Sequence, residues 1–247
     1  TPVFKQLSFE PIANNWAVPK QIGLVWDYIK YFNHDRTEKA KVEALDIISP
    51  TWFRMVQEDG TILNSGSITY ANDAKSKGYK LWGLVTNSFD PELTSRFLAN
   101  EDYQDNFIRQ LLIYSSLYSL DGINIDFENI YYKDKDAFTA FVARLTDKLH
   151  KQNLVVSVDI TVPSSSPNWS MVYDRKKIGE IVDYVAVMTY DEHWGSSPKS
   201  GSVASLRWVE RGIQRTLESI PSEKILLGLP FYTRLWEEER QPNGRIN

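Results

Sequence analysis

Short apolar runs alternate along this chain with longer stretches whose apolar residues recur at helical spacing. Continuous apolar, β-branched runs predict buried strands at 21–26, 45–49, 79–86, 122–127, 154–162, 182–189 and 224–229. Amphipathic stretches predict helices at 102–120, 134–152, 175–181 and 205–220. Asp59-Gly60, between the apolar flanks of 53–63, predicts a hairpin. Strand and helix therefore alternate through most of the sequence.

This alternation favours a parallel sheet with right-handed crossovers. The uniformly apolar strands predict a (β/α)8 barrel of the TIM type, which typically takes about 250 residues. A doubly wound open sheet is the alternative, but no glycine fingerprint follows the first strand. Residues 1–247 are interpreted as a single domain, since no linker or repeat divides them.

The pattern contains one strand fewer than a closed barrel needs. The residues after the last predicted strand, 237–247, are polar, so we expect the eighth strand to be missing from this chain. The domain is then a truncated barrel, unless residues 1–20 or a second chain cover the gap. Because an open barrel exposes two strand edges, we expect a chain extended by one strand to be more active.

Composition narrows the classes of function. The 247 residues include 28 Lys and Arg and 32 Asp and Glu, so the chain has no excess of positive charge that would attract nucleic acid. No apolar run approaches the roughly 18 residues of a membrane-spanning helix, and no membrane insertion is expected. The absence of cysteine excludes disulfides and a thiol nucleophile. The 3 histidines lack metal spacing, and neither a metal nor another cofactor is expected.

The densest group of polar residues within an apolar run is 121–128, DGINIDFE. Alternate residues of a strand face the same side, so Asn124, Asp126 and Glu128 share one face. Burying two carboxyl groups is costly unless they are hydrogen-bonded or chemically useful. Glu128 ends the strand, and barrel active sites lie at the carboxyl ends of strands. This pattern predicts a catalytic pair; a solvated acidic edge strand is the less favoured interpretation.

Residues 121–128 resemble the DGxDxDxE signature of glycoside hydrolase family 18, the chitinase family, with Asn124 in place of the second Asp. The segments 188–191 and 228–232 are similar to motifs on the sixth and seventh strands of that family. Further segments at 50–53, 190–194 and 201–205 resemble a bacterial branch often joined to LysM cell-wall-binding modules. That branch includes spore-cortex peptidoglycan hydrolases, and such a module is possible outside this chain.

The resemblance implies a substrate-assisted, retaining mechanism without a carboxylate nucleophile. Glu128 is then the general acid and base, Asp126 orients the 2-acetamido group of the substrate, and Tyr190 donates a hydrogen bond to its oxygen. The remaining residues that we expect to contact or support the substrate are Asp121, Asn124, Met188, Asp191, Trp26, Trp52, Tyr232 and Trp236. The tryptophans follow predicted strand ends, where sugar platforms and ordinary core packing are equally compatible with the sequence.

The implied substrate is an N-acetylglucosamine-containing glycan, with bacterial peptidoglycan ahead of chitin. A catalytically inactive, lectin-like member is the alternative, although such proteins typically lose the acid that Glu128 provides. The implied location is the outside of a bacterium, its cell wall or its spore cortex. For Asn124 we expect an amide that donates to Asp126 and keeps Asp126 ionised to lower pH. An anionic Asp126 then opposes ionisation of Glu128.

Overall fold

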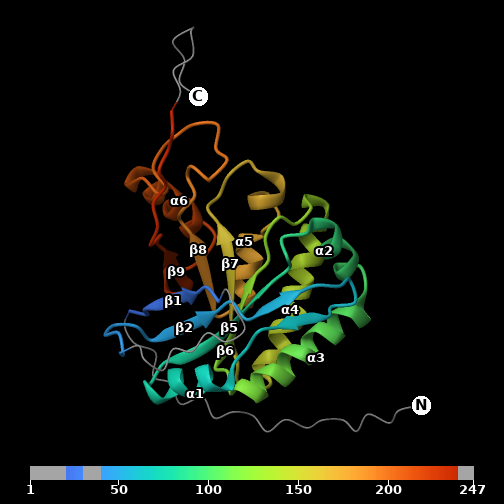
Figure 1. Ribbon diagram of the computed structural model, residues 1–247. Helices are drawn as coiled ribbons and strands as arrows, with labels where there is room; N and C mark the ends of the chain where they lie inside the picture. Colours follow the sequence, from blue (N-terminus) through green and yellow to red (C-terminus); the bar gives the residue numbers. More distant parts are fainter. Residues whose placement is uncertain (1–20, 30–39, 239–247) are drawn as a thin grey trace, which may run out of the picture.

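The computed structural model describes residues 21–29 and 40–238. Seven strands follow one another in a curled sheet, and each neighbouring pair is parallel (Figure 1). In spatial order they are β1 (Leu24–Asp27), β2 (Ile47–Pro50), β5 (Lys80–Thr86), β6 (Gly122–Asp126), β7 (Val155–Thr161), β8 (Tyr184–Met188) and β9 (Ile225–Gly228). These are the predicted strands, with ends shifted by a few residues.

The predicted hairpin is confirmed beside the carboxyl end of β5. Its strands are β3 (Phe53–Met55) and β4 (Ile62–Asn64), and β3 pairs in parallel with the end of β5. Gly60, in the connection, has a φ of +81°, a conformation that glycine adopts without the clash of a Cβ atom.

Helices lie on the outer side of the sheet, where they cover its apolar face (Figure 1). The α-helices are α1 (Ile68–Ser76), α2 (Pro91–Leu98), α3 (Glu101–Tyr118), α4 (Lys135–His150), α5 (Arg175–Ile181) and α6 (Leu206–Leu217). Shorter turns are η1 (Tyr132–Asp134), η2 (Pro167–Met171) and η3 (Ser222–Lys224). Sequence periodicity missed α1 and α2, although Ser67 and Asp90 cap their first turns and Pro91 begins α2.

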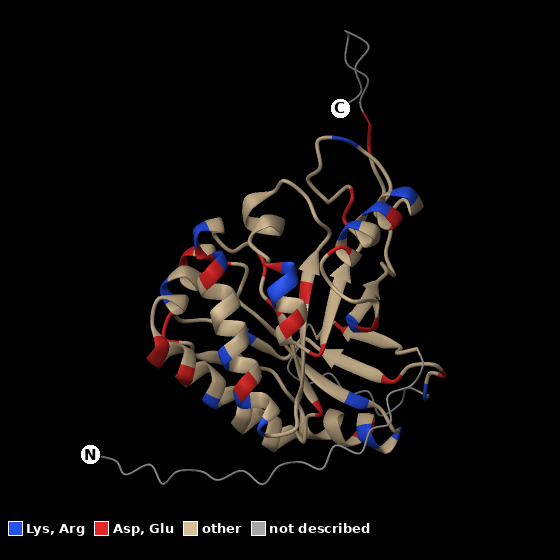
Figure 2. Ribbon diagram, turned by 180° about the vertical axis from the view of Figure 1, so that it is seen from behind, with Lys and Arg blue, Asp and Glu red and all other residues tan. Residues whose placement is uncertain are grey.

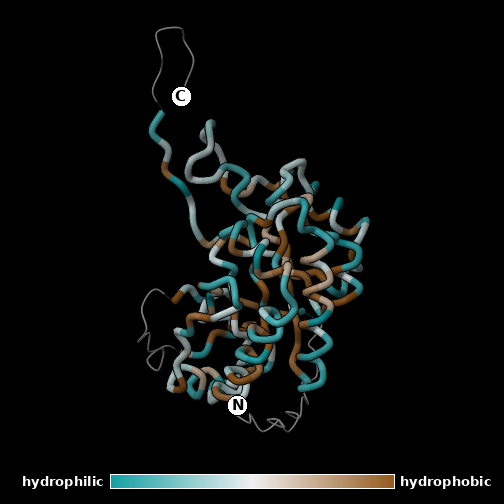
Figure 3. Tube along the Cα trace, turned by 90° about the vertical axis from the view of Figure 1, so that its right-hand side faces the viewer, coloured by the Kyte–Doolittle hydropathy of each residue, from teal (hydrophilic) through white to brown (hydrophobic). Residues whose placement is uncertain are grey.

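The core between sheet and helices is apolar, whereas charges of both signs are interspersed on the outer helices and loops (Figures 2 and 3). Its centre contains a cluster of buried phenylalanines: Phe97, Phe107, Phe127, Phe138 and Phe141. Phe127 follows β6 and joins the strand to α2, α3 and α4. Its neighbours along the chain, Asp126 and Glu128, therefore point to the opposite, inner side.

The barrel is incomplete, as the sequence predicts. β1 and β9 are the two ends of the strand order, and within 21–29 and 40–238 no strand joins them. The suggestion that residues 1–20 cover this gap lies outside the described part of the chain. None of the helices in the described part is long and apolar enough to cross a membrane.

Candidate active site

A cavity of about 1150 Å³ opens at the carboxyl ends of β6, β8, β9 and β1 and continues along the gap between β1 and β9. This cavity lies where barrel enzymes carry their chemistry. The structure brings most of the residues expected from the sequence together in its lining: Trp26, Asp126, Glu128, Met188, Tyr190, Asp191 and Tyr232.

Hydrogen bonds with buried side chains fix the backbone at Glu128. Its N–H donates to Asn87 Oδ1 at 3.0 Å, and its carbonyl accepts from Asn87 Nδ2 at 2.8 Å. The preceding carbonyl, of Phe127, accepts from the Tyr173 hydroxyl at 2.9 Å. Asn87 and Tyr173 are both buried, so these bonds are shielded from water. Sequence reasoning missed Asn87, although its place directly after β5 marks it as a polar residue at a strand end.

The Glu128 carboxyl group is set up to hold a proton. Burial, followed by the negative charges of Asp126 and Asp191, raises the pKa of Glu128 to about 8. The carboxyl is therefore mostly neutral near pH 7 and has a proton to donate. An ordinary exposed glutamate is ionised at that pH.

Asn124 lies beneath the cavity in a different arrangement from the one expected. Its Nδ2 donates to Ser157 Oγ at 2.9 Å and to Asp159 Oδ1 at 2.7 Å. Its Oδ1 accepts from the indole of Trp26 at 2.8 Å. No bond from Asn124 to Asp126 is present in the described residues, and the expectation that Asn124 keeps Asp126 ionised is wrong. Burial and the nearby charge of Asp159 instead raise the pKa of Asp126 well above its ordinary value.

Tyr190 stands between two other aromatic rings at the mouth of the cavity. Its ring centroid lies 6.2 Å from that of Trp26 and 6.2 Å from that of Tyr232, both edge to face. Burial and then the nearby carboxylates raise the pKa of the Tyr190 hydroxyl. The hydroxyl therefore stays protonated throughout the physiological range and can act as a hydrogen-bond donor.

Asp191, immediately after Tyr190, is fixed by two partners from the segment that follows β9. Its Oδ1 accepts from Tyr232 Oη at 2.8 Å and from Arg234 Nη2 at 2.6 Å. Its backbone has a φ of +59°, a left-handed conformation that aspartate tolerates better than most residues. Sequence reasoning missed Arg234, which neutralises part of the Asp191 charge facing Glu128.

Three expected substrate residues lie away from the cavity. Trp52 is 1 % exposed, and its ring packs against Tyr70 and Tyr118 at centroid distances of 5.2 and 5.1 Å. Trp52 is core, because its side chain points toward the helices. Asp121 lies at the amino end of β6, where it pairs with Lys80 at 3.0 Å.

Trp236 is the third of these residues. Its indole donates to the carbonyl of Gly201 at 2.9 Å, so it fastens a loop outside the cavity lining. The expectation of a direct sugar contact is wrong for Trp52 and Trp236, because strand-end position does not determine which way a side chain points. Asp121, expected to support the site from below, lies at the far end of β6 from the cavity lining.

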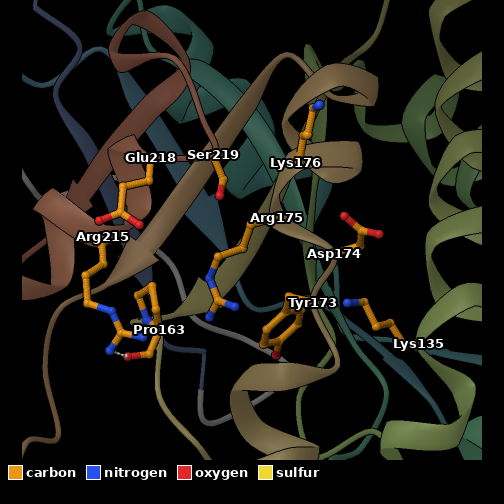
Figure 4. A pocket seen from close by; sticks show the side chains of 9 residues that line it. All are labelled: Lys135, Pro163, Tyr173, Asp174, Arg175, Lys176, Arg215, Glu218 and Ser219. Carbon is orange, nitrogen blue, oxygen red and sulfur yellow. Dashed lines mark hydrogen bonds between the residues drawn. The ribbon is translucent and has the colours of Figure 1, made fainter.

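A second cavity, of about 300 Å³, lies between α5 and α6 and is rich in basic side chains (Figure 4). Arg175 Nη2 donates to the Thr161 carbonyl at 2.9 Å, and Arg215 Nη1 donates to the Pro163 carbonyl at 2.8 Å. Burial lowers the pKa of Arg175 to about 10. These bonds tie down the loop after β7. None of the described residues form a group suited to hold a metal ion.

A parallel β/α barrel with paired carboxyl groups and aromatic rings at its strand ends is the architecture of a barrel glycoside hydrolase. Residues 26–246 match the family described as Glycosyl hydrolases family 18, and the chain belongs to that family. The resemblance seen in the motifs is thereby confirmed.

Several relatives of this chain are Bacillus proteins. The chain is 33 % identical over 192 residues to the uncharacterized glycosylase YvbX of Bacillus subtilis, covering 73 % of this chain and 55 % of that protein. A cortical fragment-lytic enzyme of Bacillus subtilis is 25 % identical, with 73 % and 43 % covered. The crystal structure of the spore cortex-lytic enzyme SleL of Bacillus megaterium has a TM-score of 0.71 and 26 % identity, covering 84 % of this chain and 49 % of that one. This chain thus spans about half the length of these relatives.

Proposed function

We propose that this chain hydrolyses β-1,4 bonds next to N-acetylglucosamine by a retaining, substrate-assisted mechanism. The observation that carries the proposal is the neutral Glu128 carboxyl, with a pKa near 8, beside Asp126 in a cavity flanked by aromatic rings. A proton donor at a strand end, beside a second carboxyl group and aromatic rings, suits a reaction in which the substrate supplies its own nucleophile.

Each residue has a defined part in the proposed reaction. Glu128 gives its proton to the glycosidic oxygen as that bond breaks, while the 2-acetamido oxygen attacks the anomeric carbon. Tyr190 donates its hydroxyl hydrogen bond to the acetamido oxygen, and Asp126 accepts from the acetamido N–H as nitrogen gains positive charge. The Glu128 carboxylate then takes a proton from water, which opens the oxazolinium ring and restores the acid.

We propose bacterial cell-wall glycan as the substrate, with chitin-type glycans second, and the cell wall or spore cortex as the place of action. The support is the set of cortex-lytic relatives rather than any residue that distinguishes the two glycans. A cell-wall-binding module outside this chain fits the same proposal, since wall hydrolases gain from being held on an insoluble substrate.

The test is release of fragments from purified peptidoglycan and from chitooligosaccharides, identified by mass spectrometry. Glu128→Gln should lower turnover about 10²–10⁴-fold, because the amide keeps the shape but has no acidic proton. Oligosaccharide binding should remain largely intact. Exposed Glu180, on α5, provides the matched control, and Glu180→Gln should leave turnover unchanged.

Three results count against the proposal. Full activity of Glu128→Gln removes Glu128 from the mechanism. Efficient cleavage of a substrate with glucosamine in place of N-acetylglucosamine removes substrate assistance, since the acetamido nucleophile is then missing. Binding by the unaltered chain without any turnover favours the inactive, lectin-like alternative.

A further inference from the structure

A carboxyl group that sequence reasoning did not single out lies beside the proposed catalytic pair. Asp159, on β7, is 1 % exposed and lines the same cavity as Asp126 and Glu128. In the parallel register, Asn124 pairs with Ser157 and Ile125 with Val158. Asp126 and Asp159 are the next residues on their strands and share the inner face, so their side chains lie at the same level.

One fully buried oxygen of the two carboxyl groups has no hydrogen-bond partner among the described residues. Asp159 Oδ1 accepts from Asn124 Nδ2 at 2.7 Å. Asp126 Oδ1 is buried and has no hydrogen-bond partner among the described residues. A buried oxygen of this kind is costly, but a proton held between the neighbouring carboxyl groups satisfies it.

We propose that Asp159 is a positioning residue that shares one proton with Asp126. The side chain of Asn124, two residues before Asp126 on β6, is an amide and cannot share a proton in this way. The second carboxyl group therefore comes from the neighbouring strand, β7. This inference rests on the proposed function for its catalytic consequence, but the shared proton itself is a property of the unliganded protein.

The electrostatics of the surrounding groups agree with one proton for two carboxyl groups. Burial is the largest cause that raises the pKa of Asp126 and of Asp159 well above their ordinary values. The charge of Asp159 adds to the shift of Asp126, and the charge of Glu128 adds to that of Asp159, whereas hydrogen bonds from Asn124 and Trp26 lower the pKa of Asp159. The groups that face Asp159 are Asp126 and Glu128 from the β6 side, Asn124 beneath, Trp26 from β1 and Tyr190 after β8. No cation is among them.

The shared proton has a use in the proposed reaction. As the acetamido nitrogen becomes positive, Asp126 must be anionic to accept its N–H. The proton then resides on Asp159, and it returns to the shared position when water opens the ring. The proton is conserved over the cycle, and no bond to Asp159 is made or broken other than this O–H bond. Asp159 thereby sets the charge of Asp126 without touching the substrate.

Infrared spectroscopy of protonated carboxyl groups tests the shared proton directly. The Glu128→Gln variant serves as background, because it removes the other carboxyl that is protonated near pH 7. This background should show the band of a proton held between two carboxyl groups, and adding Asp159→Asn should replace it with the band of a single buried carboxyl, because burial alone still raises the pKa of Asp126. Adding Ser157→Ala instead, which removes only an uncharged partner of Asn124, should leave the band in place. Persistence of the shared-proton band without Asp159 overturns the inference.

Exchanging the side chains at positions 124 and 159 tests whether Asp126 needs one neighbouring carboxyl group, whichever strand supplies it. Asp159→Asn alone should lower kcat about 10-fold or more with little change in KM and alter the acidic limb of the rate–pH profile. The double exchange Asn124→Asp/Asp159→Asn, which restores a carboxyl from the other strand, should recover much of kcat. The double exchange should also restore the infrared band in the Glu128→Gln background. That band would show that the exchanged variant folds.

The outcomes separate this inference from the proposed function. Wild-type kcat in Asp159→Asn overturns the role of Asp159 even if glycan hydrolysis is confirmed. A double exchange no more active than Asp159→Asn also overturns it. If the wild type releases no fragments from either glycan, the proposed function fails, and the infrared result still decides whether Asp126 and Asp159 share a proton.

Discussion

Glu128 occupies a position that favours chemistry over stability. Its carboxyl lies beside Asp126 and faces Asp191, in a buried setting where ionisation is unfavourable. A raised pKa means that the folded protein binds a proton more tightly than the unfolded chain does. Stability from this group is therefore present below the unfolded pKa, near 4.3, and falls as the pH rises toward about 8.

Replacing Glu128 by glutamine should consequently stabilise the protein in a pH-dependent way. The neutral amide does not ionise, so the variant should exceed wild type by at least about 1 kcal/mol of unfolding free energy at pH 8. The difference should shrink toward pH 4, where both side chains are neutral. Denaturant titrations at several pH values measure it. A difference that does not depend on pH would show that Glu128 titrates normally.

Asp191 offers a second test of the same electrostatics. Its negative charge helps to raise the pKa of Glu128, so Asp191→Asn should lower that pKa and move the alkaline limb of kcat/KM below the wild-type position near pH 8. Rates with a soluble chitooligosaccharide across pH 5–10 show the limb. Glu180→Gln, on the outer surface, should leave it in place. A limb that stays fixed in Asp191→Asn contradicts this source of the shift.

At the scale of elements, side chains of neighbouring elements position the carboxyl end of β6. Phe127 anchors it in the core, while Asn87, which follows β5, clamps the backbone of Glu128. The carboxyl is therefore aimed by two adjacent strands and by the helices behind them. A small shift of this end misplaces the proton donor, and catalysis depends strongly on such placement.

The clamp predicts a specific phenotype for Asn87→Ala. Loss of its buried bonds should cost about 1–3 kcal/mol of stability and lower kcat more than it changes KM. Gln104→Ala is the matched control, because Gln104 is another buried amide, which donates to the Leu98 carbonyl at 2.9 Å and lies outside the lining of the cavity. It should lose comparable stability and keep its kcat. Equal kcat values in the two variants would mean that Asn87 acts on stability alone.

Local patterns predicted the parts of this molecule that depend on local periodicity. Strand alternation placed Asp126 and Glu128 on one face, and apolar runs located the sheet strands. Sequence reasoning missed α1 and α2 because each helix is short and buries only a few apolar residues. Sequence reasoning missed Asp159 and Asn87 for another reason. Their roles depend on the register between strands, which the spacing of residues along the sequence does not determine. Trp52 was misplaced because the direction of a side chain after a strand end depends on packing.

At the scale of the whole molecule, the proposed site and the sheet edges left unpaired within the described residues form one continuous surface. The cavity that holds Glu128 runs on between β1 and β9, where its lining is mainly apolar. Leu227 on β9 is 49 % exposed, and Leu229 and Phe231, which follow β9, are exposed beside it. Unpaired strand edges with apolar side chains are templates for association between chains.

We therefore expect this chain to self-associate through that edge, and Leu227→Lys to weaken the association. A lysine there adds charge to the β9 edge, as natural proteins do on exposed strands, and should change the unfolding free energy by no more than about 0.5 kcal/mol. Leu206→Lys is the matched control, since Leu206 is 73 % exposed at the start of α6, outside the lining of the gap. Light scattering over a concentration series should show wild type and Leu206→Lys growing in mean mass while Leu227→Lys stays monomeric to higher concentration. If the two lysine variants behave alike, association does not use the β9 edge.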